Sequence, residues 1–123
     1  MPESAPGRTL TVLRFIVGGG TWLAPRSMGR LFGLDIDANP QAAYVGRLFA
    51  VRDAVLGVGL VATTGDARRL WWRVGVACDA ADAIAGVLAR RSGDLPAVSA
   101  ALVTGTAIAA ASLGAAAIVA DDA

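Results

Sequence analysis

The stretch "PAVSAALVTGTAIAAASLGAAAIVA" (residues 96–120) contains 25 residues without one charged side chain. As an α-helix it would be about 37 Å long, which is enough to cross the ~30 Å hydrocarbon core of a bilayer with some tilt. Its small residues recur every four positions, as at Ala101, Gly105 and Ala109, and this spacing lets membrane helices approach closely. A helix in a small soluble protein usually keeps one polar face, and this segment has none. It predicts a membrane span.

Three further apolar segments of helical length precede it, at residues 9–25, 41–63 and 69–90. Residues 26–40 are too polar to span, and their scattered apolar side chains predict a short segment resting on the bilayer surface. The short connection at residues 64–68 predicts that the second and third segments form an antiparallel hairpin. Together these segments take up most of residues 1–123, so we expect a single domain. The predicted fold is all-α, an integral membrane four-helix bundle with a short interfacial segment between the first and second spans.

The first of these segments, "TLTVLRFIVGGGTWLAP" (residues 9–25), could be a secretory signal peptide or an uncleaved span. A signal peptide needs a small-residue cleavage site of the A-x-A type, and "TWLAPRS" (residues 21–27) has none. We therefore expect a span, with Trp22 near the membrane interface. The run of glycines at residues 18–20 does not form a dinucleotide-binding fingerprint, because the third glycine would fall on Leu23 and no strand precedes it. Close helix packing or a kink is the better explanation.

The composition excludes several kinds of site. The chain is 55% apolar, with a mean hydropathy of +0.58, and it contains no His and no Lys. Without His it lacks the usual near-neutral acid–base group and the commonest ligand of transition metals. Its single cysteine, Cys78, cannot form an internal disulfide or a cysteine-rich zinc site. A net charge of +1 with scattered arginines is not typical of a nucleic-acid surface. We predict no metal, no cofactor and no nucleic-acid partner, and we expect the lipid bilayer of the cytoplasmic (inner) membrane as the surroundings.

Charged residues interrupt the second apolar segment, "YVGRLFAVRDAVLGVGLVA" (residues 44–62), at Arg47, Arg52 and Asp53. Its strongly apolar residues favour insertion by about 3–5 kcal/mol in total, whereas three central charges oppose insertion by about 7–10 kcal/mol. Insertion is therefore unfavourable unless the charges are paired, solvated or placed at the interface. The third segment repeats the problem with Asp79 and Asp82.

Pairing across the predicted hairpin would resolve much of this conflict. With the turn centred in the connection, Arg52 lies level with Asp79, and Asp82 lies between Arg47 and Arg52 in height. Asp79 and Asp82 share a helix face because they are three residues apart. Arg47, near the start of its helix, could instead extend to the membrane interface. Asp53 has no evident partner, and hydroxyls of another span, a polar cavity or protonation could each accommodate it.

Three stretches of the chain carry a resemblance to a known family. They are "LAPRSMGRLFGLD" (residues 23–35), "GRLFAVRDAVLGVGLVA" (46–62) and "ACDAADAIAGVLAR" (77–90), and the most specific element is the pair Arg52 and Asp53 followed by "VLG". Over about residues 10–120 the chain resembles a family of small four-span bacterial membrane proteins that is defined only as a domain of unknown function. The resemblance implies the four-span topology and implies no activity. It singles out Arg52, Asp53, Asp79 and Asp82 for testing.

The sequence leaves three functions open and does not decide whether the protein is an enzyme. The first is a membrane protein whose charges fix helix packing or line a site for a lipophilic small molecule, as a single chain or a homo-oligomer. The second is a membrane enzyme that uses paired carboxylates for isomerisation, epoxide opening or cyclisation of a lipophilic substrate. The third is an oligomeric proton-coupled small transporter, although the small multidrug transporters carry an essential acid in the first span, where this chain has Arg14. The ion-pair or ligand-binding candidates are Arg47, Arg52, Asp53, Asp79 and Asp82. The catalytic candidates are Asp53, Asp79 and Asp82.

Overall fold

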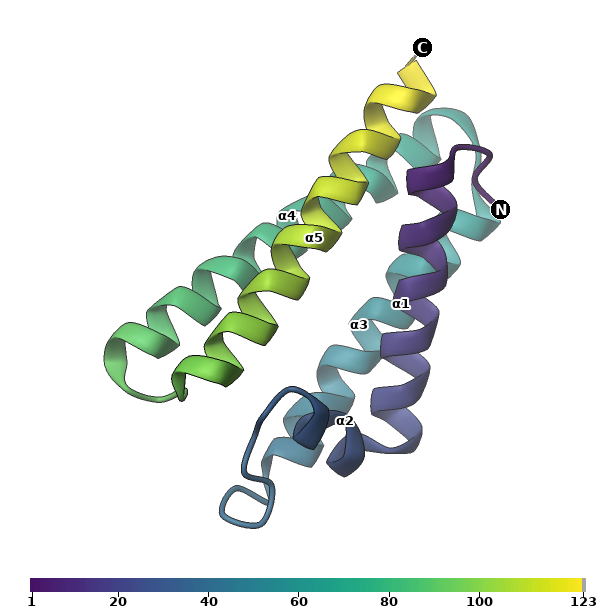
Figure 1. Cartoon of the computed structure of the whole chain (residues 1–123). Helices are drawn as coiled ribbons and strands as arrows, with labels where there is room; N and C mark the ends of the chain where they lie inside the picture. The colour runs from purple at the N-terminus through teal and green to yellow at the C-terminus, as the bar shows by residue number, and fades with distance from the viewer. Residues whose placement is uncertain (123) are drawn as a thin grey trace.

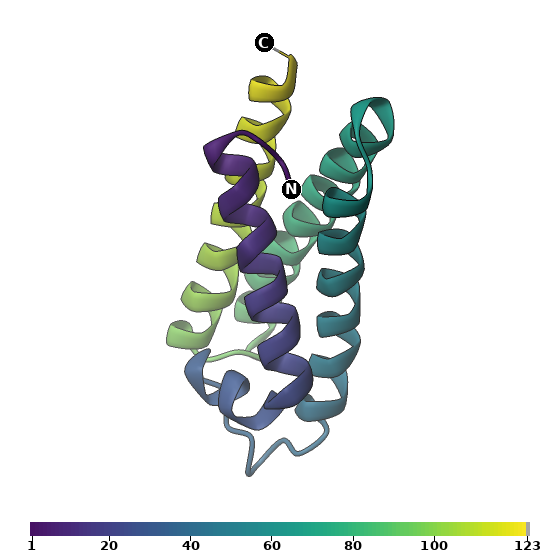
Figure 2. The same cartoon turned by 90° about the vertical axis from the view of Figure 1, so that its right-hand side faces the viewer.

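The computed structural model describes residues 1–122, and within that range it contains five α-helices and no strand. The helices are α1 (Ala5–Leu23), α2 (Pro25–Leu31), α3 (Ala42–Ala62), α4 (Gly65–Ser92) and α5 (Ala97–Asp122). The four long helices run alternately up and down, and the short α2 lies at one end (Figures 1 and 2). The all-α prediction is confirmed.

The long helices begin and end within four residues of the predicted segments. α1 begins early because the Ser4 hydroxyl accepts the Gly7 N–H at 3.2 Å, which caps the helix, and Pro6 suits its first turn. α4 begins at Gly65 and so takes up most of the predicted connection. It ends at Ser92, and the following Gly93 has a φ of +82°, the left-handed conformation typical of a helix C-terminus. The three consecutive glycines do not break α1, which continues to Leu23.

Close packing joins the long helices in two pairs, α1 with α3 and α4 with α5. α3 and α4 are consecutive, yet they share fewer contacts, and the two pairs diverge toward α2 (Figure 1). Glycines explain these pairings. Gly18 of α1 lies against the backbone of Ala50 and Ala54 in α3, and Gly86 of α4 lies against Thr104 of α5. The predicted hairpin of α3 and α4 is present in chain order, but each of the two helices packs chiefly on another partner.

The four long helices meet at the end of the bundle that carries the chain termini. Leu10, Leu60, Trp72 and Ala117, one residue from each long helix, form a buried hydrophobic cluster there. This cluster joins the two helix pairs at this end.

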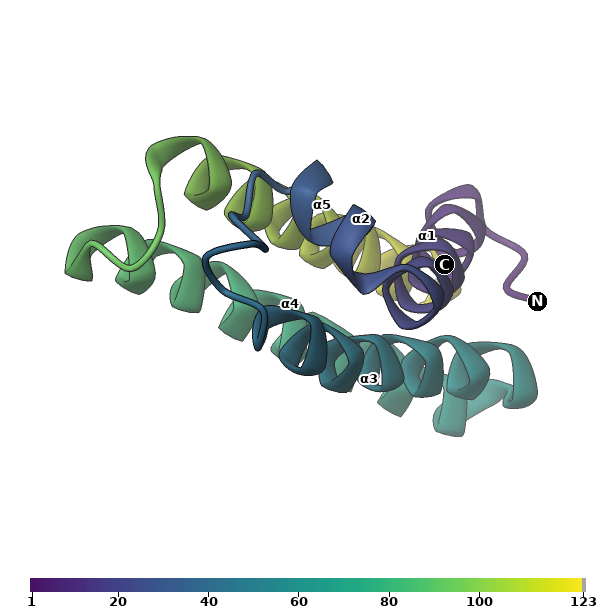
Figure 3. The ribbon, with the colours of Figure 1, turned by 90° about the horizontal axis from the view of Figure 1, so that it is seen from below.

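The predicted interfacial segment forms α2 and the loop that follows it. α2 contacts α1 and α3, and Ile36 of the loop is buried against Gly29. The Ser99 hydroxyl of α5 donates a hydrogen bond to the Gly33 carbonyl at 2.7 Å, which ties the loop to the start of the last long helix. Figure 3, seen from below, shows α2 and its loop across the end of the bundle that lies opposite the chain termini.

The distribution of side chains is the reverse of that in most water-soluble proteins. Within residues 1–122, 24 large hydrophobic side chains are exposed and five are buried, whereas the buried set includes Arg14, Asp53 and Asp79. By length and composition, one of the described helices, α5, is apolar enough to cross a membrane, and 17% of its most apolar window is buried. Length and composition therefore support one span, and the four-span prediction is not confirmed on that ground.

Candidate functional site: a buried arginine–aspartate cluster

Five charged side chains from three helices form a connected network inside the bundle. They are Arg14 of α1, Arg52 and Asp53 of α3, and Asp79 and Asp82 of α4, and we call them the Arg/Asp cluster. Two arginines and three aspartates give the cluster a formal charge of −1. It links α4 to the α1–α3 pair.

Arg14 and Asp79 form the most buried contact of the cluster. The two guanidinium nitrogens Nη1 and Nη2 donate to Asp79 Oδ1 and Oδ2 at 3.3 and 2.8 Å, and the side chains are 3% and 5% exposed. This bidentate geometry matches the planar guanidinium to both carboxylate oxygens. Gly75, one turn before Asp79, makes room for the arginine, since a Cβ there would lie 2.6 Å from Arg14 Nη2.

Arg52 and Asp82 form a second bidentate pair between α3 and α4, at 2.9 and 2.5 Å. This pair is less enclosed, because the side chains are 33% and 30% exposed. The Arg52 guanidinium also lies over the ring of Phe49, 4.6 Å from its centroid, which adds a cation–π contact within α3.

Asp53 lies between the two pairs and connects them. Its Oδ1 is 3.5 Å from Arg14 Nη1 and 3.6 Å from Arg52 Nη2, and its side chain is 8% exposed. Neither contact is a hydrogen bond, and this oxygen has no hydrogen-bond partner in the described residues. Asp53 is therefore held by two positive charges without a direct bond to either.

The predicted charge pairs are partly wrong. Asp79 pairs with Arg14 and not with Arg52, which instead pairs with Asp82, because α3 and α4 diverge while α1 brings its arginine to Asp79. The expectation that Asp53 lacks a partner is also wrong, since two arginines lie beside it.

Arg47 lies outside the cluster. Its side chain is exposed, and its Nε donates to the Trp22 carbonyl at 3.1 Å, with the guanidinium 5.8 Å from the centroid of the Trp22 ring. This geometry agrees with an arginine directed toward the end of the bundle. Arg14 is the one member of the cluster that is not among the candidates predicted from the sequence. Its position inside an apolar segment nevertheless indicates that it needs an opposite charge nearby.

The cluster consists of closely spaced opposite charges. Arginine stays protonated in proteins, and each aspartate has at least one arginine within 3.6 Å. Two cavities in the described part of the chain, one near the termini and one beside Trp71, do not include the cluster. Among residues 1–122, no group of three His, Cys, Asp or Glu side chains has the arrangement to hold a metal ion.

Comparison with known proteins gives no relative on which to base a function. No family model matches the sequence, and no curated protein or solved structure matches the chain. The resemblance to a four-span bacterial family therefore stays an expectation, and function has to be argued from the geometry.

Proposed function

We propose that the chain is an integral membrane four-helix bundle of the inner membrane, in which the Arg/Asp cluster fixes how α4 packs on α1 and α3. The observation that carries this proposal is the inverted side-chain distribution, with charges inside the bundle and large apolar side chains outside. Such a protein needs an apolar solvent around it and ion pairs within it.

The outer surface of the bundle suits a bilayer. A large apolar side chain near the middle of each long helix is at least half exposed: Ile16, Val55, Ile84 and Ile108. In water such area is unfavourable by about 25 cal/mol per Å², whereas in hydrocarbon that penalty disappears. The four helices are about 28–42 Å long, from 19 residues in α1 to 28 in α4, so each could match a ~30 Å core.

Pairing makes the buried charges compatible with that surface. An isolated Arg or Asp at the centre of a spanning helix opposes insertion by about 2.5–3.5 kcal/mol. In the cluster each of these charges faces an opposite charge, which offsets this cost. A buried ion pair contributes little net stability, and its best-attested role is to select one helix register over others. The cluster is suited to that role because its pairs join α4 to both α1 and α3.

The geometry supports an enzyme or a transporter less well. An enzyme that used Asp53 or Asp79 would need an opening to those carboxylates, whose side chains are 8% and 5% exposed, and the cavities near the termini and beside Trp71 do not include them. A transporter would need a polar path through the bundle, whereas Arg14 and Asp79 are almost fully enclosed. A packing role requires neither feature.

Cysteine labelling in open membrane vesicles tests the membrane proposal. In a Cys78→Ala background, single cysteines are placed mid-helix (Ile16→Cys, Val55→Cys, Ile84→Cys, Ile108→Cys) and at exposed end positions (Asn39→Cys, Asp66→Cys). A water-soluble maleimide should label the end positions within minutes and the mid-helix positions only after detergent is added, because hydrocarbon excludes the reagent.

The matched positions make the result decisive. All six side chains are exposed, so a bundle surrounded by water would be labelled at similar rates at every position. Equal labelling without detergent would overturn the proposal.

A further inference from the structure

A second charged site lies at the termini end of the bundle, away from the Arg/Asp cluster. A cavity of about 490 Å³ lies there between the starts of α1 and α4 and the end of α5. Its charged lining residues are Glu3, Arg68, Arg69 and Asp121. This volume falls within the range of about 300–1,000 Å³ that is typical of small-molecule sites.

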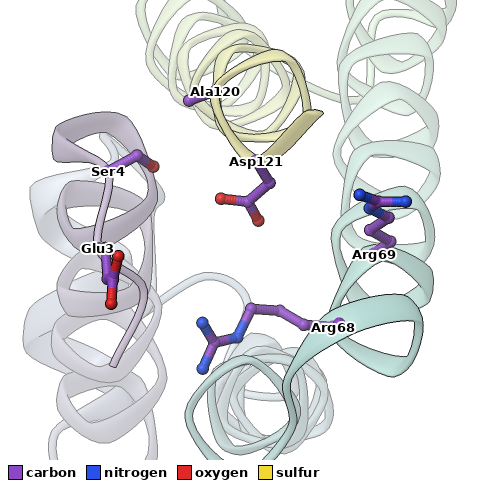
Figure 4. Close-up of a pocket in the computed structure, with 7 residues that line it drawn as sticks. Glu3, Ser4, Arg68, Arg69, Ala120 and Asp121 are labelled. Atoms are coloured by element: carbon purple, nitrogen blue, oxygen red, sulfur yellow. The ribbon is translucent and has the colours of Figure 1, made fainter. Parts of the chain in front are cut away.

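Figure 4 shows how these side chains are arranged. Arg68 extends from α4 across the space, Asp121 points into it from the last turns of α5, and Glu3 lies on the opposite wall beside the start of α1. Asp121 is held in place because its Oδ2 accepts the indole N–H of Trp72 at 2.8 Å. The site therefore presents both signs of charge across one cavity.

Three of these charges have no ion-pair partner within residues 1–122. Arg69 is occupied, since it contacts Asp66 at 3.5 Å and Asp122 at 3.2 Å. Glu3, Arg68 and Asp121, in contrast, form no salt bridge in that range, and the buried Nε of Arg68 has no hydrogen-bond partner there. A buried guanidinium nitrogen without an acceptor is unfavourable unless another group completes it.

The charge of the cavity selects the kind of ligand. Two acidic and two basic residues line it, so the formal charge of the lining is zero. A purely anionic ligand would face two carboxylates, and a purely cationic one would face two guanidinium groups. A small zwitterion, with its anionic group on Arg68 and its cationic group between Glu3 and Asp121, would match both.

We propose that this cavity binds a phosphoethanolamine zwitterion, which is the headgroup of a membrane phospholipid. The phosphate would accept hydrogen bonds from the Arg68 guanidinium, and the ammonium would donate to the carboxylates of Glu3 and Asp121. Assignment to a lipid rests on the proposed membrane function, because that function places this end of the bundle at headgroup depth. Trp71, which is partly exposed, lies in the first turns of α4 at this end, as aromatic residues commonly do at membrane interfaces.

Native mass spectrometry of the full chain in mild detergent tests the proposal. Phosphatidylethanolamine, phosphatidylglycerol and phosphatidylcholine are added separately, since the second lacks the ammonium and the third replaces its N–H donors with methyl groups. The wild type should retain phosphatidylethanolamine about tenfold better than either of the others, as expected for one or two charge-assisted hydrogen bonds. Equal retention of the three lipids would overturn the proposal.

Two variants and one control assign the binding to the cavity. Arg68→Gln should weaken phosphatidylethanolamine binding about tenfold, because the phosphate loses its charged donor. Asp121→Asn keeps an oxygen that can accept the Trp72 N–H, and it should remove most of the preference over phosphatidylglycerol. Arg73→Gln is the control, because this arginine of the same helix is exposed and does not line the cavity. A loss in the control as large as that in Arg68→Gln would refute the site.

A test with soluble glycerophosphoethanolamine distinguishes a lipid headgroup from a free compound as the ligand. It also distinguishes failure of the zwitterion site from failure of the membrane proposal. If it stabilises the wild type against thermal unfolding, and the lipid does not bind, the zwitterion site is supported and its occupant is a free compound. If the cysteine labelling shows a water-exposed bundle that still binds the soluble compound, the membrane proposal fails while the site stands. If the labelling shows a membrane bundle and neither compound binds, the site alone fails.

Discussion

The Asp79→Asn substitution tests whether the Arg/Asp cluster fixes the helix packing. Asp79 accepts both donors of Arg14 at 2.8 and 3.3 Å, and the two side chains are 5% and 3% exposed. Removing one partner of a buried ion pair typically destabilises a protein by about 3–5 kcal/mol, because the other charge is left uncompensated. Asn keeps one acceptor oxygen, and Asp53 remains 3.5 Å from Arg14, so we expect the lower value of about 3 kcal/mol.

Reversible unfolding in mixed micelles measures this loss. The protein is titrated with sodium dodecyl sulfate, and the fluorescence of Trp72, which is 1% exposed in the folded bundle, reports the transition. A loss of about 3 kcal/mol lowers the equilibrium constant for folding roughly a hundredfold. A loss below about 1 kcal/mol, the upper range for exposed pairs, would refute the assignment of Arg14 and Asp79 as a buried pair that holds the helices together.

Two further variants separate lost charge from lost shape. Asp66→Asn changes a 99% exposed carboxylate of the same helix, and it should leave the unfolding transition unmoved. The double substitution Arg14→Met with Asp79→Leu replaces the pair by apolar side chains of similar size. It should be more stable than Asp79→Asn alone, because no buried guanidinium is left without Asp79, and Asp53 keeps its contact with Arg52 at 3.6 Å. If the double variant were instead the less stable of the two, steric fit and not charge compensation would be the main contribution.

Three more predictions follow from particular contacts, each measured by the same unfolding titration. Gly18→Ala should destabilise the bundle by about 1–3 kcal/mol, because the new Cβ would lie 3.1 and 3.2 Å from backbone atoms of Ala50 and Ala54, which cannot move aside. Gly19 has open space, so Gly19→Ala should stabilise the bundle by up to about 1 kcal/mol. Similar effects of the two substitutions would contradict the close α1–α3 contact. Gly93→Ala should destabilise by about 1–2 kcal/mol, because its φ is +82°, whereas Gly105→Ala, inside a helix with open space, should not. The Arg52–Asp82 pair is about one-third exposed, and if it faces hydrocarbon, Asp82→Asn should destabilise the bundle equally in about 0.05 M and about 1 M NaCl. A smaller destabilisation in high salt would show that water reaches the pair.

The sequence predicts the helices of this protein better than their contacts. Apolar segments of helical length are local features, so the four long helices lie within four residues of the predicted ranges. Their pairing depends on which glycines face which neighbour. The close approach at Gly18 joins α1 to α3, and no pattern within either helix identifies that partner. The predicted hairpin of α3 and α4 therefore gave the wrong main partner for both helices, since α3 packs chiefly on α1 and α4 on α5.

For the candidate site, too, the sequence predicts which residues are involved better than it predicts which of them pair. Charged residues inside apolar segments need opposite charges nearby. This physical need predicts that Arg52 and Asp53 of residues 41–63 and Asp79 and Asp82 of residues 69–90 belong to one site. The exact pairs followed from an idealised straight hairpin, and the divergence of α3 and α4 moves Asp82, not Asp79, to Arg52.

Arg14 shows that the charges of all the long helices have to be considered together. The residues of α3 point in different directions, so Arg47, Arg52 and Asp53 cannot all face α4, and those two helices alone give Asp53 no evident partner. The arginine of α1 supplies the second contact to Asp53 and both hydrogen bonds to Asp79, at a position where Gly75 leaves room for its guanidinium. If a bilayer surrounds the bundle, no water can complete a charge in its interior, so a charged residue in one apolar segment predicts a partner in another even when the two are 65 residues apart in sequence.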